Sequence, residues 1–185
     1  MKSLDLSVFD SFPVIDCGRF ILREIIREDV DEIFKIRSNP AVNRYMSRYA
    51  MTEKDDAAKL IERVSEGFKN KQSIGWAASL PGQNKMIGSC GFNRIELQHL
   101  RAEIGGEMDA VFWGRNIGAE AVATIIKFGF EKLMLHSIEA RVDPENRSAI
   151  ALLDHLGFIR EGYFREFVFK KGTYSDMAIY TLIEE

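Results

Sequence analysis

The chain has 185 residues, of which 46% are hydrophobic, and a formal net charge of −3 at pH 7. This length suits one domain with a single core, and the charge argues against a general nucleic-acid surface, which needs a clustered basic face. The apolar runs are far shorter than the roughly 20 residues of a membrane span, and the N-terminus lacks the pattern of a signal peptide, so we expect a cytoplasmic protein. The two cysteines and three histidines are scattered, which indicates free thiols and no metal centre.

Apolar residues recur with a period of two in some segments and of about 3.6 in others, which predicts an α/β chain. The strands are expected at residues 19–23, 73–80, 85–95, 102–108, 137–142, 158–170 and 174–183. The helices are expected at 27–40, 52–67, 116–133 and 146–157, and a turn KGT should join the last two strands. Neither an internal repeat nor a flexible linker divides this β-α-α-β-β-β-α-β-α-β-β order into two domains.

Individual residues mark the ends of the predicted helices. The Asn-Pro pair at 39–40 should end the first helix. Thr52 and Asp55 have the spacing of a capping box at the start of the second helix. Asn146 is expected to cap the last helix, and Gly157 to end it at the C′ position.

The segment WGRNIG, residues 113–118, lies between a strand and a helix. Gly114 and Gly118 let the backbone approach a ligand, Asn116 tolerates left-handed backbone angles, and Arg115 adds a cation. Because a helix N-terminus presents unpaired N–H groups and the positive end of the helix dipole, such a loop attracts phosphate. A glycine-containing turn without a ligand is equally compatible with this spacing. The motifs GxxxxGKS/T and GxGxxG are both absent, which disfavours nucleotide triphosphatases and dinucleotide dehydrogenases.

Four segments, in order, resemble the successive motifs of the GNAT acyltransferase superfamily, and most closely its Rim-type branch of ribosomal-protein N-terminal acetyltransferases. They are RFILREI…EDVDEIFKIRSNPAV, AEIGGEMDAVFWGRNIGAEAV, HSIEARVDPENRSAIALLDHLGFIREGYFRE and GTYSDMAIYTL. The resemblance implies an N-acetyltransferase domain over 14–185 behind an N-terminal extension, 1–13. It also implies a single-domain fold whose mixed, mostly antiparallel sheet is flanked by helices and splays between its fourth and fifth strands. By resemblance, acetyl-CoA would lie in the cleft that this splaying opens and would serve as the acyl donor, without a metal.

The family's pyrophosphate loop, Q/R-x-x-G-x-G/A, falls on residues 113–118. By resemblance, the residues that bind acetyl-CoA are Met108, Trp113, Gly114, Arg115, Asn116, Ile117, Gly118, Ala119 and Asn146. Trp113 replaces the polar first residue, as is common in the Rim-type branch, and Asn116 replaces the first motif glycine. If that position needs a positive φ, Asn is the next best residue; if it needs the absence of a Cβ, CoA binding is weakened. Asn146 is expected either to face the pantetheine arm or to serve only as a helix cap.

Attack of an amine on a thioester needs a proton acceptor and a hydrogen-bond donor for the developing oxyanion. Glu103 matches the family position that directs a carboxylate toward the amine, often through water, although it is equally readable as an exposed carboxylate or a partner of Arg101. Glu107 is a further candidate. A main-chain N–H near Met108 is the expected oxyanion donor. The paired glycines at 105–106 predict a bulge or a close approach to the backbone.

The acid that protonates the leaving thiolate is less well matched. The Rim-type serine commonly stands three residues after the asparagine, where this chain has Ala149, whereas Ser148 lies about 100° away around the helix. Ser148 is the candidate acid, with Tyr163, Tyr174 or water as alternatives. A thiolate leaves readily without an acid, because the reference pKa of a thiol is only about 8.5.

At pH 7 roughly one α-amino group in ten is neutral, against roughly one lysine side chain in a few thousand, so a site without a strong base suits a protein N-terminus. The resemblance places segments 38–51 and 170–176 at the acceptor entrance. The side chains expected there are Arg37, Tyr45, Arg165, Tyr174 and Asp176. Alternatives are a small amine, such as a polyamine or an aminoglycoside, as acceptor, or a non-catalytic acyl-CoA-binding module. A monomer and a homodimer are both compatible with the sequence.

Overall fold

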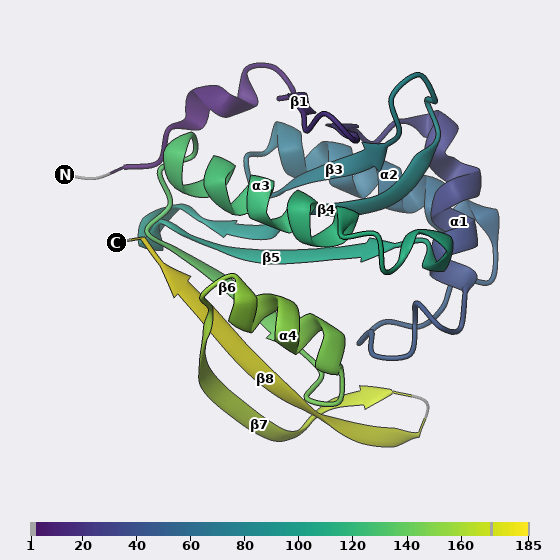
Figure 1. The fold of residues 1–185 in the computed structure, drawn as a ribbon, viewed down its shortest axis with the longest axis vertical. Helices are drawn as coiled ribbons and strands as arrows, with labels where there is room; N and C mark the ends of the chain where they lie inside the picture. The colour runs from purple at the N-terminus through teal and green to yellow at the C-terminus, as the bar shows by residue number, and fades with distance from the viewer. Residues whose placement is uncertain (1–2, 171, 185) are drawn as a thin grey trace.

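The computed structural model describes residues 3–170 and 172–184. Their strands form one sheet in the order β1-β2-β3-β4-β5-β6-β8-β7, in which every neighbouring pair is antiparallel except β5 and β6 (Figure 1). The strands are β1 (Ile15–Asp16), β2 (Ile21–Glu24), β3 (Ile74–Ser79), β4 (Met86–Glu96), β5 (Arg101–Met108), β6 (Ser137–Val142), β7 (Ile159–Lys170) and β8 (Thr173–Ile183). The helices are α1 (Val30–Ser38), α2 (Lys54–Lys69), α3 (Ile117–Glu131) and α4 (Arg147–His155). The predicted single-domain α/β fold is confirmed.

Helices cover both faces of the sheet, with α3 and α4 on one side and α1 and α2 on the other (Figure 1). The larger core lies under α3, where the buried ring of Trp76 on β3 meets Phe128 edge to face, with centroids 5.2 Å apart. Such buried aromatic side chains contribute about 1.5–3 kcal/mol each to folding. The N-terminal segment packs on the same core, since Phe9 is buried and the Trp76 indole donates to the Pro13 carbonyl at 2.7 Å.

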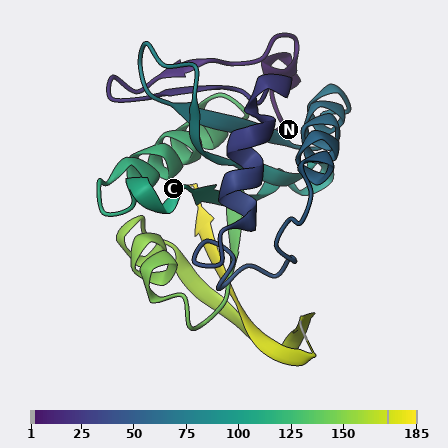
Figure 2. The same ribbon diagram turned by 90° about the vertical axis from the view of Figure 1, so that its right-hand side faces the viewer.

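The sheet opens between β5 and β6, the fourth and fifth of the strands predicted from the sequence. The two strands pair from Arg101↔Ser137 only as far as Ile104↔Ala140. Beyond that point β5 stays paired with β4 as far as Met108, so its other edge faces the opening. The β7–β8 hairpin leaves the rest of the sheet on the far side of this opening, and Figure 2 shows the chain after α1 running toward that hairpin.

The start of α1 is fixed by a buried ion pair. Both carboxylate oxygens of Asp29 accept hydrogen bonds from Arg23 on β2, at 2.7 and 2.8 Å, and Asp29 also accepts from the Ile26 N–H at 2.9 Å. Because only 2% of the Asp29 side chain is exposed, loss of one partner would leave an uncompensated buried charge. This pair holds α1, and therefore the loop that follows it, against the sheet.

Several predicted ends differ from the observed ones. The capping box at Thr52 is wrong: the chain is still extended at Glu53, which occupies the N-cap without a side-chain bond. The helix therefore begins one residue later than a capping box at Thr52 requires. The Asp55 carboxylate forms an ion pair with Lys59 at 2.6 Å and does not take part in a cap. The helix runs to Lys69 rather than ending near Gly67. In contrast, Asn39 does end α1.

Other local predictions are mostly met at the ends of strands and helices. The first predicted strand, 19–23, is observed as β2, which begins and ends slightly later. The β1 strand before it was not predicted, because a strand of two residues leaves no periodic pattern in the sequence. Gly157 follows α4 with φ of 84°, which confirms its place as the C′ residue. The predicted KGT turn includes Lys171, and the extension 1–13 includes residues 1–2, which lie outside the described residues. None of the described helices is both long enough and apolar enough to span a bilayer.

The paired glycines of β5 do not form the predicted bulge. The register with β4 is continuous through Gly105 and Gly106, and the shift falls between Phe92 and Arg94 instead. The predicted close approach is met by the neighbouring strand. A Cβ at Gly105 would lie 2.4 Å from Nδ2 of Asn93, and one at Gly106 would lie 2.9 Å from the Ser89 carbonyl oxygen.

The Cys90 thiol is expected to be unreactive in the folded protein. Burial raises its pKa to about 12, so at pH 8 only about one Cys90 in ten thousand is a thiolate, against about one in four for a free thiol. A Cys17→Ser variant treated with an aromatic disulfide reagent at pH 8 should therefore release almost no thiolate dye until denaturant is added. Release at the rate of a small free thiol would contradict this expectation.

Candidate active site

The loop before α3 holds its backbone in a conformation that exposes a row of N–H groups. Gly114 and Asn116 have φ of 73° and 64°, and α3 begins at Ile117. Of the described residues, none accepts a hydrogen bond from the backbone N–H groups of residues 114–119. Together with the positive end of a 15-residue helix, this row of donors is suited to an anion such as a pyrophosphate.

Asn116 shows why a residue other than glycine is accepted at this motif position. Its backbone is left-handed, which Asn adopts more readily than other residues with a Cβ. Its side-chain amide also donates to Glu120 at 3.4 Å. The observed φ agrees with the alternative in which the position requires a positive φ.

The loop is also tied to the N-terminal part of the chain. Arg19 donates to Glu120 at 2.6 Å and to the carbonyl of Arg115 at 2.9 Å. Since the Arg19 side chain is more than half exposed, each bond is worth little stability by itself. Their effect is to tie the loop before α3, through the Arg115 carbonyl, to Arg19, which lies shortly before β2.

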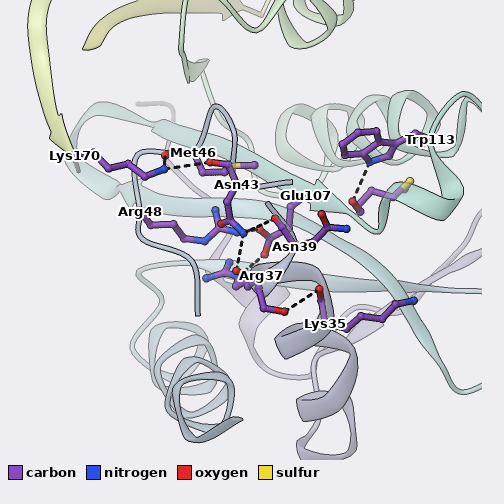
Figure 3. Close-up of polar contacts among 11 residues, drawn as sticks. Lys35, Arg37, Asn39, Asn43, Met46, Arg48, Glu107, Trp113 and Lys170 are labelled. Atoms are coloured by element: carbon purple, nitrogen blue, oxygen red, sulfur yellow. Dashed lines mark hydrogen bonds and ion pairs between the residues drawn. The ribbon is translucent and has the colours of Figure 1, made fainter. Parts of the chain in front are cut away.

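The end of β5 directs polar backbone groups into the opening of the sheet. The Asp109 N–H donates to Ile87 on the β4 side at 2.9 Å. Because hydrogen bonding alternates along an antiparallel pair, Met108 directs its N–H and carbonyl away from β4 and toward the opening. The Met108 carbonyl accepts from the Trp113 indole at 3.0 Å (Figure 3). The Met108 N–H therefore faces the space where the family resemblance places the thioester.

A cleft of about 620 Å³ lies between the loop after α1 and the β7–β8 hairpin. It borders the sheet opening, because Asp143, the first residue after β6, lines it. Its walls combine hydroxyl, amide, charged and apolar groups. The described residues that line the cleft are Ser38, Pro40, Ala41, Asn43, Arg44, Tyr45, Met46, Ser47, Ala50, Asp143, Val168, Lys170, Thr173, Ser175, Asp176 and Met177.

Glu107 holds the loop after α1 against β5. Its carboxylate accepts one hydrogen bond from Arg37 and another from Arg48, and only 5% of its side chain is exposed (Figure 3). Burial lowers the pKa of the Arg48 guanidinium, an effect that Glu107 opposes and Arg37 reinforces. A carboxylate engaged by two guanidiniums is poorly placed to take a proton from an amine. Glu107 therefore acts as a structural anchor.

Lys170 joins the same loop to the hairpin across the cleft. Its ammonium donates to the carbonyl of Asn43 at 3.2 Å and to that of Met46 (Figure 3). Within the loop, the Asn43 amide donates to the carbonyls of Arg37 and Asn39 at 2.7 and 2.8 Å. The loop is thus bonded on one side to β5 and on the other to β7.

The predicted proton acceptor lies outside this cleft. The Glu103 carboxylate faces Arg141 at 3.3 Å and Arg94 at 4.0 Å. The alternative that Glu103 pairs with Arg101 is wrong, because Arg101 pairs with Glu96 at 2.5 Å. Glu103 is not among the described residues that line the cleft, and its role in proton transfer stays a prediction.

The predicted acceptor residues are only partly brought together. Tyr45 and Asp176 line the cleft, whereas Arg37 is bonded to Glu107 and is not among the described residues that line it. Arg165 is exposed on β7, outside the lining, and Tyr174 packs against Phe169, with ring centroids 4.8 Å apart and ring planes tilted by 48°.

Asp176 is already engaged by two donors. It accepts from the Tyr163 hydroxyl and, at 2.8 Å, from the Glu166 N–H. The hydrogen bond from Tyr163 lowers the pKa of Asp176 most, and the bond from the Glu166 N–H adds to this effect. The bond between Tyr163 and Asp176 also raises the pKa of Tyr163. A raised pKa makes Tyr163 a weaker acid for a leaving thiolate.

The residues predicted on α4 keep their expected positions. The Asn146 side-chain oxygen accepts from the Ala149 N–H at 3.2 Å, which confirms the helix cap. No described residue accepts a hydrogen bond from its side-chain NH₂ group, which stays available to a ligand. Ser148 is exposed in the first turn, and its role as an acid stays a prediction. Within the described residues, no three His, Cys, Asp or Glu side chains gather as metal ligands would.

The sequence interpretation did not single out Arg48, Lys170, Asp143 or Glu120. Arg48 and Lys170 become significant only through partners 59 and 124 residues away, which no local pattern indicates. Glu120 was detectable in principle, since an acidic residue in the first turn of a helix is a common stabilising feature. Asp143 was detectable as the carboxylate that directly follows a strand at the predicted opening.

Comparison with known proteins agrees with this geometry. Residues 19–159 match the acetyltransferase (GNAT) domain family. The uncharacterized N-acetyltransferase p20 of Bacillus licheniformis is 34% identical over 166 residues, which cover 90% of this chain and 93% of p20. RimL, a ribosomal L7/L12 alpha-N-protein acetyltransferase solved with coenzyme A, has a TM-score of 0.84 at 19% identity, covering 92% of this chain and 98% of its own. Spermidine N-acetyltransferase from Vibrio cholerae, solved with CoA and spermine, has a TM-score of 0.79 at 22% identity, covering 90% and 96%.

The splayed sheet, the loop before α3 and these matches define an acetyltransferase enzyme. The chain belongs to the GNAT family, as its four motifs predict. The two solved structures share its fold.

Proposed function

We propose that the protein moves an acetyl group from acetyl-CoA to a primary amine, and that this amine is the N-terminal α-amino group of a protein. The observation that carries the proposal is the presence of one site on each side of the sheet opening, one joined to the end of β5 and the other at the end of β6. The row of free N–H groups at residues 114–119 lies at the start of α3, and the cleft lined by Asp143 lies beside β6.

The loop before α3 supports acetyl-CoA as the donor. Its free N–H groups and Arg115 fit a pyrophosphate, and the open space around Gly114, with no atom within 4 Å of an added Cβ, lets a phosphate approach. Asn146 has a side-chain NH₂ group left for the pantetheine arm. Bound acetyl-CoA supplies an activated acyl group as a thioester.

In the proposed reaction, the amine nitrogen attacks the thioester carbonyl carbon, a C–N bond forms, and the C–S bond breaks. The amine loses one proton, and the departing thiolate gains one. The Met108 N–H is placed to stabilise the oxyanion that develops in between. Glu103 is the predicted proton acceptor, acting through water, and Ser148 is the predicted acid.

An α-amino group suits this site better than a lysine side chain. The Glu107 carboxylate at the end of β5 is 5% exposed and is held by two arginines, so it offers no strong base. An α-amino group needs none, because roughly one in ten is already neutral at pH 7. The likeness to RimL agrees with this acceptor class, and the likeness to spermidine N-acetyltransferase makes a polyamine the alternative to exclude.

The test is release of CoA thiol from acetyl-CoA by the purified protein. One set of reactions contains hexapeptides with ribosomal-protein N-termini, and a matched set contains the same peptides with blocked α-amino groups. A third set contains spermidine and kanamycin. Release that requires the free N-terminus supports the proposal. Release only with spermidine or kanamycin would contradict the protein acceptor, and no release from any set, by protein that binds acetyl-CoA, would contradict acetyl transfer to these classes.

A further inference from the structure

The register of β5 and β6 places two carboxylates opposite each other at the sheet opening. The last pair of the parallel ladder is Ile104↔Ala140. Continuing the same offset for three residues brings Glu107 and Asp143 to facing positions on the two sides of the opening. The two positions therefore flank the opening in which the thioester is proposed to lie.

Among the described residues, cationic side chains pair with only one of the two carboxylates. Glu107 is paired with both Arg37 and Arg48. Asp143 has no lysine or arginine within ion-pair distance among the described residues. One Asp143 oxygen accepts from the Glu145 N–H at 2.9 Å, and no described residue donates to its second oxygen, which is left for a ligand. Asp143 is half-buried and lines the cleft.

The other carboxylate of the cleft is less available. Asp176 accepts from the Tyr163 hydroxyl and the Glu166 N–H, one on each oxygen. It also lies on β8, whereas Asp143 directly follows β6 at the opening itself. Its position and its unused hydrogen-bonding capacity therefore both make Asp143 the more available of the two carboxylates.

We infer that Asp143 binds the amine of the acceptor. The inference rests on the proposed function and deepens it, because it names the group that selects a cationic acceptor. In the ammonium form the amine donates to the free Asp143 oxygen, which brings the nitrogen to the opening. The ammonium then passes one proton to solvent water, and the neutral nitrogen attacks the thioester carbonyl carbon. The second proton that the nitrogen loses as the C–N bond forms is balanced by the one that the departing thiolate gains.

The test compares Asp143→Asn with Asp154→Asn. Asparagine keeps the oxygen that accepts from Glu145 and removes only the charge, so the turn before α4 is preserved. Asp154 is exposed on α4, outside the cleft lining, and provides the matched control. With the best amine of the peptide and spermidine sets, Asp143→Asn should raise KM by about tenfold to a hundredfold, as expected for loss of a charge-assisted hydrogen bond. The Kd for acetyl-CoA should be unchanged, and Asp143→Glu should recover part of the acceptor KM.

A KM for Asp143→Asn within twofold of the Asp154→Asn value would overturn the inference. A parallel loss of acetyl-CoA binding would also overturn it, because that result would indicate a structural role. If the wild-type protein shows no turnover, the proposed function fails, and calorimetric titration of the CoA-bound protein with the hexapeptides and spermidine decides the inference alone. Weaker binding to Asp143→Asn than to wild type would support it, and equal binding, or none to either, would overturn it.

Discussion

Substitution of Glu107 by glutamine is expected to lower the free energy of unfolding by about 3–5 kcal/mol. The wild-type carboxylate compensates two guanidiniums, and 5% of its side chain is exposed. Glutamine has almost the same shape but leaves Arg37 and Arg48 as neighbouring like charges in a poorly hydrated place. Because the desolvation penalty of both cations remains, the loss exceeds that of a surface pair, which is about 0–1 kcal/mol.

Urea unfolding followed by circular dichroism measures this loss. Glu62→Gln on the exposed side of α2 makes the same chemical change outside the core, and it should stay within about 0.5 kcal/mol of wild type. If both variants unfold at the same urea concentration, the Glu107 pairs contribute no more than exposed ones, and the loop after α1 must be held by other contacts.

Substitution of Gly118 by aspartate is expected to weaken CoA binding by about a hundredfold or more while leaving the fold as stable as before. Gly118 is the second residue of α3, and an added Cβ would meet only the Met108 side chain, at 3.9 Å. Aspartate in a first helical turn is favourable, and replacement of a helical glycine gains stability. The same negative charge repels a phosphate at the loop N–H groups and competes for them.

Gly118→Ala separates the charge from the added bulk. Calorimetric titration with CoA should give the alanine variant a Kd within about fivefold of wild type and the aspartate variant a much higher one. Thermal unfolding without CoA should show no loss of stability for either variant. Equal CoA affinity for wild type and Gly118→Asp would mean that the phosphates bind elsewhere.

Local physical chemistry accounts for what was predictable from the sequence. The left-handed backbone at Asn116, the cap at Asn146 and the helix end at Gly157 depend on preferences of single residues, and all three are observed. The order of strands and helices follows from the spacing of apolar residues. The predicted capping box at Thr52 failed because the backbone is still extended at Glu53, so the helix begins one residue later than the box requires.

The acceptor side depends on contacts between distant parts of the chain. Arg37 was predicted to meet the acceptor, but it bonds to Glu107, 70 residues later. Asp176 was predicted there as well, and it does line the cleft. Its commitment to Tyr163 follows from the register of β7 and β8, which shifts twice. No periodicity in the sequence specifies such shifts, so partners across them could not be assigned in advance.

The bond from Lys170 to the loop after α1 has a mechanical consequence for the whole molecule. From β5 the contacts run through Glu107 and Arg48 to the loop, through Met46 to Lys170 on β7, and back through β8 and β6 to β5. These contacts form a closed frame, whereas a hinge would join two arms at one end only. Widening one side would strain the opposite side, so we expect a frame of this kind to admit a narrow chain end more readily than a broad, folded surface.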